Sequence, residues 1–168
     1  ASTGNGTSQH LTGELFKMQN KLFITHIPYR GTGPALQDLV AGQVDMMFDT
    51  LAGAAPFIKS GQLIAVAVAS NKRSEAFPNV PTAQELGISG FIVSSWYAMW
   101  AIKGTPKEIV EKMSNEVQIA LASPEIKERW AGMGASVPKM TRPELAAYIN
   151  QEIVRWSEVV KKSGAKLD

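Results

Sequence analysis

The residues best suited to chemistry lie where predicted helices begin, and they are mostly glycines and hydroxyls. The predicted helices that start at Thr82, Thr105 and Thr141 each carry a glutamate at capping-box spacing. The first predicted helix, residues 7–21, follows the run Ser-Thr-Gly-Asn-Gly-Thr-Ser and has its first acid at Glu14. Because such a helix start offers free N–H groups and partial positive charge, it suits an anionic ligand.

Two further turns also precede predicted helices and contain polar residues that could bind a ligand. Residues 29–34 read Tyr-Arg-Gly-Thr-Gly-Pro with no acid before Asp38, and Asp49 with Thr50 supplies an acceptor after the next predicted strand. All three turns follow predicted strands, so in a parallel sheet they share the carboxyl edge, where ligands bind in open α/β folds. Ordinary turns between strands and helices also favour Gly, Ser and Thr, so spacing alone leaves that alternative open.

Sharper cofactor and metal motifs are incomplete. The run Gly4, Asn5, Gly6 lacks the third glycine of a dinucleotide fingerprint, since Gln9 stands there, and it lacks the lysine of a phosphate-binding loop. His10 and His26 are not at metal-ligand spacing, which favours structural roles for both. We therefore expect no cofactor and no metal.

Catalysis is not favoured either. Ser2, His10 and Asp49 can be drawn as a nucleophilic triad, but no Gly-x-Ser-x-Gly elbow is present, so we expect no enzyme. Arg30 could bind a carboxylate through both nitrogens or lie solvated on the surface. The aromatic run 95–100 favours core packing over ligand stacking.

The elements that position these turns alternate between strands and helices. Apolar strands are predicted at residues 23–28, 44–48 and 63–69, with helices between them, including one that begins near Pro34 and one at 52–59. Strands that are apolar throughout favour a parallel sheet covered by helices, an α/β architecture. A polar loop with a short helix from Thr82 follows. The rest is helical, with helices starting at Thr105, Ser123 and Thr141.

Composition excludes several classes of protein. The chain has 168 residues, a net charge of +2 with dispersed basic residues, and no cysteine. These values argue against nucleic-acid binding, disulfides and thiolate metal sites. No apolar run is long enough to span a membrane, and no signal peptide is present.

Taken together, the motifs resemble the Bug solute receptors, the periplasmic components of tripartite tricarboxylate transporters. The resemblance rests on residues 1–11, 26–31, 41–45, 77–82, 85–87, 104–106 and 164–168, in that order. It implies a two-lobed type II periplasmic-binding-protein clamshell that closes on a small organic carboxylate. Residues 1–95 are expected to form the second, ligand-binding lobe without its first strand. Residues 96–168 are expected to form the crossover and a helical tail belonging to the first lobe.

By position, the resemblance implies a set of ligand contacts in the three turns. The first turn would contribute Ser2, Thr3, Gly6, Thr7 and Ser8, with His10 as a neighbour that could be structural. The second would contribute Tyr29 and Arg30, and the third Asp49 and Thr50. Asp49 would accept from a ligand hydroxyl, an amine or an ordered water.

The resemblance also implies a cellular location and binding partners. The parent protein would be periplasmic and would deliver its ligand to membrane permease subunits. The present chain would be a C-terminal fragment holding half of the site, with weak ligand binding alone. Its apolar tail faces, around Met113, Val117, Tyr148 and Trp156, would be covered by the missing N-terminal lobe or by self-association. The alternatives are an effector-sensing clamshell domain of a transcription regulator and, third, an acyl-transfer enzyme.

Overall fold

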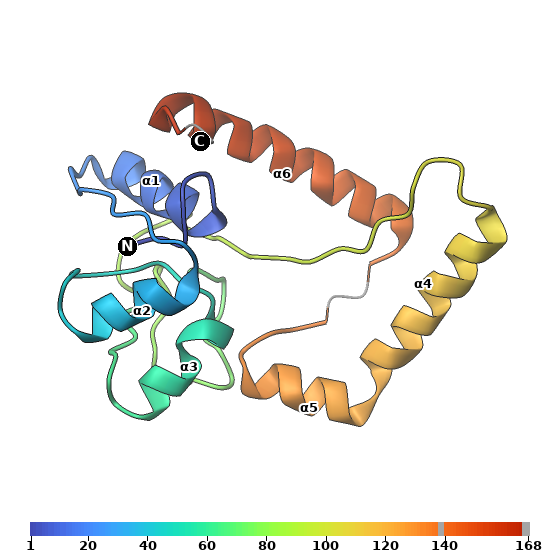
Figure 1. Ribbon diagram of the computed structural model, residues 1–168, viewed down its shortest axis with the longest axis horizontal. Coiled ribbons are helices and arrows are strands. Elements are labelled where there is room, and N and C mark those ends of the chain that lie inside the picture. The colour runs from blue at the N-terminus through green and yellow to red at the C-terminus, as the bar shows by residue number, and fades with distance from the viewer. Residues whose placement is uncertain (138–139, 166–168) are drawn as a thin grey trace.

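The computed structural model describes residues 1–137 and 140–165, and its regular elements are helices (Figure 1). They are α1 (Ser8–Asn20), α2 (Thr32–Val40), α3 (Leu51–Lys59), α4 (Lys107–Ala122), α5 (Pro124–Gly132) and α6 (Arg142–Ser163). Each of these helices was expected from the sequence, with ends that differ by only one or two residues. The terminal motif 164–168 reaches beyond the described residues.

Helix α1 shows why its sequence is helical. The Thr7 hydroxyl accepts from the His10 N–H at 3.4 Å and caps the first turn, and Leu15 is buried on the inner face. The helix ends at Lys21, which adopts the left-handed conformation (φ 53°) and donates its N–H to the Lys17 carbonyl. The helix is therefore fixed at both ends by local chemistry.

The predicted sheet is the main difference from expectation. The segments 23–28, 44–48 and 63–69 run without helix, but pairing in the described residues is limited to two isolated bridges, Ser2 with Pro28 and Val68 with Thr82. Both bridges are parallel, but each joins a predicted strand to a residue outside the predicted strands, Ser2 or Thr82. The expectation that the strands are buried on both faces is wrong for this chain, since Phe23 is 96% and Ile64 89% exposed. A β-ladder needs repeated backbone hydrogen bonds between two neighbouring segments. Among the described residues, the predicted strands pair with another segment only at Pro28 and at Val68.

Two of the predicted capping boxes form. The Thr141 N–H donates to Glu144 Oε2 at 2.7 Å, and the Thr141 hydroxyl accepts from the Glu144 N–H at 3.4 Å. Thr82 and Glu85 make the equivalent bonds at 2.7 and 3.1 Å. The short helix expected after Thr82 is nevertheless absent, because the chain forms only turns there before Gly87 turns left-handed at φ 87°.

The third predicted capping box, at Thr105, is wrong. Helix α4 begins after Pro106, so Glu108 stands at the second helical position instead of the third. From there its carboxylate does not close the box. The Thr105 hydroxyl instead donates to the Ile102 carbonyl at 2.8 Å.

Helix α6 returns across the molecule and packs on α1 (Figure 1). The buried core consists of Leu15, Ala83, Phe91 and Val159, and Trp156 packs against it. Trp156, which was expected to be covered by a missing lobe or by self-association, is therefore packed at least in part within the chain. The tail helix shares one core with residues of the first 95 positions, because its last turns lie over the inner face of α1.

Between these parts, residues 91–102 cross as an irregular arm to α4 (Figure 1). Trp96 meets Tyr148 edge-on with ring centroids 5.7 Å apart. Tyr97 and Trp100 are 92% and 69% exposed, so the expectation that this aromatic run packs in the core is wrong for them. The arm leaves the core after Val93, whose N–H still bonds the Ala69 carbonyl at 2.9 Å. Among the described helices, none is both long and apolar enough to cross a membrane.

Candidate functional site

The first turn is held from behind by Ser2. Its N–H donates to the Ile27 carbonyl at 3.1 Å, and its carbonyl accepts from the Tyr29 N–H at 3.0 Å. Its hydroxyl lies 2.6 Å from His26 Nε2 and accepts from the Gly4 N–H at 3.2 Å. With a 1% exposed side chain, Ser2 supports the turn and does not present its hydroxyl to solvent. This corrects the expectation that Ser2 lines the ligand surface.

Gly6 needs a similar correction. Its N–H donates to His10 Nδ1 at 3.1 Å, so that amide is already occupied. The Thr7 hydroxyl donates to the Gly4 carbonyl at 2.7 Å and caps α1. The amides that start α1, those of Ser8 and Gln9, have no hydrogen-bond acceptor within the described part of the chain. They are the donors that this helix offers.

The second turn joins the first through the backbone. The Gly31 N–H donates to the Thr3 carbonyl at 3.3 Å, and Gly31 adopts φ 110°, a conformation that favours glycine. No side chain caps α2. The Tyr29 hydroxyl donates to Asp38 Oδ2 at 2.8 Å, which raises the pKa of Tyr29. Arg30 is exposed beside this turn.

The third turn points an acid against helix α3. Asp49 Oδ1 accepts from Gln9 Nε2 at 3.4 Å, while its buried Oδ2 has no hydrogen-bond partner among the described residues. Burial raises the pKa of Asp49, opposed by hydrogen bonds from Thr50 and Gln9. The Thr50 hydroxyl accepts from the Gly53 N–H at 3.3 Å and caps α3. The carboxylate fits there because Gly53 has no side chain: a Cβ would lie 2.6 Å from Oδ2.

Sequence reasoning missed Gln9 as a functional residue. Its Oε1 accepts from the hydroxyls of Thr3 and Ser8, each at 3.0 Å, and its Nε2 reaches Asp49. Gln9 thus ties the first turn to the third across 40 residues. In the sequence, Gln9 was noted only because it stands where a dinucleotide-binding loop has its third glycine. That observation excluded a motif and did not indicate a role for Gln9.

The three turns therefore meet as predicted, and the starts of α1, α2 and α3 lie at neighbouring ends of these helices, toward the middle of the view (Figure 1). None of these three helices has an acid in its first turn. Helices α4, α5 and α6 do, with Glu108, Glu125 and Glu144. The contrast in helix starts inferred from the sequence holds in full for α1 against α6, whereas the helix expected at Thr82 does not form and Glu108 closes no capping box.

The nucleophilic triad is not formed. Ser2 pairs with His26, and His10 contacts Gly6 and Glu14 instead of Ser2. Asp49 reaches neither histidine in the hydrogen bonds of the described residues. Nor do these residues contain a cluster of three or more potential metal-ligating His, Cys, Asp or Glu side chains.

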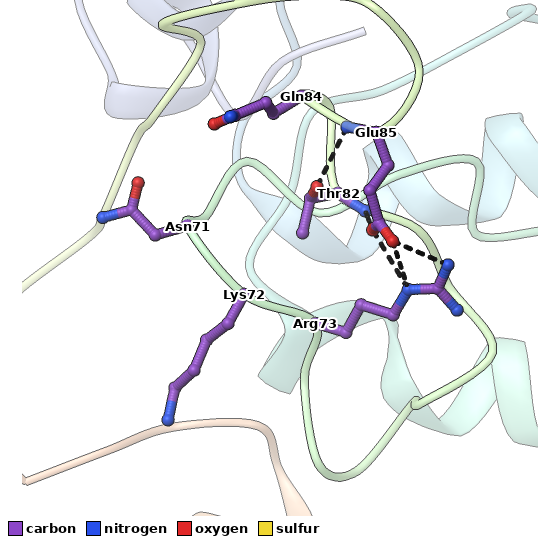
Figure 2. A pocket seen from close by; sticks show the side chains of 6 residues that line it. All are labelled: Asn71, Lys72, Arg73, Thr82, Gln84 and Glu85. Atoms are coloured by element: carbon purple, nitrogen blue, oxygen red, sulfur yellow. Dashed lines mark hydrogen bonds and ion pairs between the residues drawn. The ribbon is translucent and has the colours of Figure 1, made fainter.

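A separate polar hollow of about 470 Å³ lies on the 70–87 loop, and none of its lining residues belongs to the three turns (Figure 2). Arg73 and Glu85 form a bidentate ion pair across it, with Nε 3.0 Å from both carboxylate oxygens and Nη2 2.8 Å from Oε1. Glu85 also accepts from the Thr82 N–H. Arg73, whose guanidinium could bind an anion, is thus already paired with Glu85, although Lys72 also lines the hollow.

Solved structures with the same fold define the class of protein. The periplasmic binding protein BugD aligns with 98% of this chain at a TM-score of 0.87 and 38% identity. MatC from Rhodopseudomonas palustris, solved with bound malate, aligns with 92% at 0.84 and 38%. The chain covers 56% and 54% of those two proteins. The fold is therefore that of a periplasmic binding protein, in agreement with the α/β class predicted from the sequence.

The family follows from the sequence comparison. The model of the tripartite tricarboxylate transporter family receptor matches residues 1–165, and the chain belongs to this family. Protein BugT of Bordetella pertussis is 39% identical over 96% of the chain. The chain spans about half the length of this relative, 50%. A family of receptors fits neither the acyl-transfer alternative nor the transcription-regulator alternative.

Proposed function

We propose that this chain contributes to a receptor for small dicarboxylates and that the three turns bind the ligand. The observation that carries the proposal is that the acid-free starts of α1 and α2 meet beside a third turn, where Asp49 lies against the start of α3. Aligned helix N-termini supply N–H donors and partial positive charge to an anion. The malate in the related MatC structure supports the ligand class.

The donors that remain unoccupied suggest how a carboxylate is held. In α1 they are the amides of Ser8 and Gln9, and in α2 the uncapped start at Thr32 and Gly33 offers a second pair. The exposed Ser8 hydroxyl stands beside the first pair. Main-chain donors of this kind need no basic surface, which agrees with the net charge of +2.

Arg30 and Asp49 are proposed to set selectivity. Arg30 is exposed next to the α2 start, which supports a contact between its guanidinium and a second carboxylate of the same ligand. The partnerless Oδ2 of Asp49 is a candidate acceptor for a ligand hydroxyl or an ordered water, as the sequence suggested. A small movement of the Asp49 side chain is needed for this contact, since that oxygen is buried.

The wider setting is proposed from the family. We propose a periplasmic protein that passes its ligand to the permease subunits of a tripartite transporter. We also propose that residues 1–95 form one jaw and that an opposing jaw completes the site, with the tail contributing to the other lobe. One jaw leaves the ligand partly in water, so the chain alone binds weakly.

The test is a titration of ¹⁵N-labelled chain with malate or adipate, followed by amide shifts. We expect saturable shifts at Ser8, Gln9, Thr32 and Gly33 with a dissociation constant of about 1 mM or weaker. Malate diamide, which carries no charge, is the control. No shifts at these amides would refute the site, and a dissociation constant of roughly 1 μM would refute the one-jaw proposal.

A further inference from the structure

The chain has two histidines, and they stack on each other behind the first turn. Their ring centroids are 3.9 Å apart with an interplanar angle of 6°. His26 Nε2 lies 2.6 Å from the Ser2 hydroxyl, and His10 Nδ1 accepts from the Gly6 N–H at 3.1 Å. The two rings therefore hold the first turn at both of its ends.

The hydrogen bond from Gly6 identifies the ring nitrogen of His10 that acts as an acceptor. Because Nδ1 accepts from Gly6, it carries no proton, and in the neutral ring the proton sits on Nε2, 3.7 Å from Glu14 Oε1. A proton added to Nδ1 would face the Gly6 N–H, setting donor against donor. A charge on either ring would also lie directly over the other ring of the stack. A proton on Nδ1 is therefore incompatible with the Gly6 hydrogen bond.

The charged groups around the stack come from three segments. Glu14 and Lys17 of α1 form an ion pair beside His10. The Ala1 amino group donates to the Met46 carbonyl at 2.7 Å, and Asp45 acts on that amino group. The Ala1 amino group and Lys17 oppose a positive charge on His26, and Glu14 favours one.

Solvent can reach the pair. A small cavity of about 40 Å³ lies beside it, lined in part by Gln9, Glu14 and Met46. The pKa of His26 is lowered to about 4, first by burial and then by His10. Burial and the charge interaction with His10 thus both favour a neutral His26 in the closed turn.

We propose that the His10–His26 stack positions the first turn for ligand binding and that acid releases the turn by protonating the stack. The link to binding rests on the proposed function, while the release of the turn does not. The two histidines are positioning residues, since neither presents a group to the ligand. The affinity for a dicarboxylate therefore falls at low pH because the receptor is protonated, in addition to any effect of protonating the ligand.

The direction follows from linkage. An imidazole in the released turn titrates near its ordinary value of 6.5, whereas His26 in the closed turn titrates near 4. The released turn thus binds more protons as the pH falls from 6.5 toward 4, and acid favours it.

The first experiment needs no ligand. Hydrogen exchange of the Gly6 amide is measured by NMR from about pH 7.5 to about pH 4.5, after correction for intrinsic exchange. We expect protection to fall by about fivefold or more in the wild type. In the double variant His10→Asn, His26→Gln, polar groups remain near Nδ1 and Nε2 but do not titrate, so protection stays constant. Constant Gly6 protection in the wild type would overturn the proposal.

The second experiment measures malate binding over the same pH range. Protonation of malate affects both proteins equally, so the ratio of dissociation constants between the two pH values is compared. We expect the wild-type ratio to exceed that of the double variant by about fivefold. Equal ratios would overturn the link to binding. If malate binds neither protein, the proposed function fails, while the Gly6 exchange still tests the release of the turn.

Discussion

The side chain of Gln9 joins two turns that lie 40 residues apart, because its Nε2 donates to Asp49 Oδ1 at 3.4 Å. On its other side, Oε1 accepts from the Thr3 hydroxyl at 3.0 Å. The same residue contributes one of the unoccupied amides at the start of α1. Gln9 therefore both organises the proposed site and lies in it.

Replacing Gln9 with glutamate tests this role. The Gln9→Glu variant places a carboxylate against Asp49 and beside the α1 N-terminus, where it competes with a bound anion. We expect malate-dependent amide shifts at Ser8 to disappear while the far-ultraviolet circular dichroism stays unchanged. Gln19→Glu, at an exposed position of the same helix, adds the same charge as a matched control and leaves the shifts intact. Equal loss in both variants would mean that general charge, not the Asp49 link, is responsible.

The contact between Asp49 and Gly53 gives a stability prediction. In Gly53→Ala, the new Cβ lies 2.6 Å from Asp49 Oδ2. Alanine improves helix propensity by about 1 kcal/mol, but the overlap costs about 1–3 kcal/mol, so we expect a net loss or no gain. Asp49→Ala removes the clashing group, and in that background Gly53→Ala should stabilise. Denaturant unfolding of the four proteins in this cycle measures the coupling; additive effects would contradict the clash.

How far the sequence predicts this fold depends on the range of the interactions. Helix α6 was predicted with its cap, because Thr141 and Glu144 are close in the chain and their bonds are local. The bridge between Ser2 and Pro28 and the contact between Ser2 and His26 depend on tertiary packing, and no local pattern encodes them. The predicted strands were recognised as apolar runs, but their sparse pairing was not foreseen for the same reason.

The candidate site also combines features that are local in the sequence with features that depend on tertiary packing. The acid-free starts of α1 and α2, and the acceptor pair Asp49 and Thr50 before α3, were visible in the sequence, so the three turns were identified. Which groups in them are free could not be read, because Gly6 and Ser2 are occupied by His10 and His26 through the fold. Residue type indicated where an anion could bind, whereas the hydrogen bonds decide which donors remain.

The ion pair between Arg73 and Glu85 predicts a difference at low pH. The pKa of Glu85 is lowered from 4.5 to about 2, first by its hydrogen bond with Arg73 and then by the Thr82 N–H. Since the folded pKa lies below the unfolded value, the stabilisation is present above pH 4.5 and is lost as the pH falls toward 2. We expect Glu85→Gln to lower the melting temperature at neutral pH and to match the wild type near pH 2. Glu75→Gln, an exposed glutamate in the same loop, is the control and should change little at either pH.

The carboxylate of Glu14 predicts how the histidine stack titrates. Burial is the main cause of the lowered pKa of His26, followed by His10, while Glu14 opposes the shift by favouring a charged ring. Glu14→Gln removes that help, so the pKa of His26 should fall further below about 4 and acid release of the first turn should require lower pH. The imidazole C–H resonances measure this directly, since the chain has two histidines. Glu116→Gln, on the exposed surface of α4, should leave the titration unchanged. A shift of the titration toward higher pH in Glu14→Gln would show that the stack is not controlled by this carboxylate.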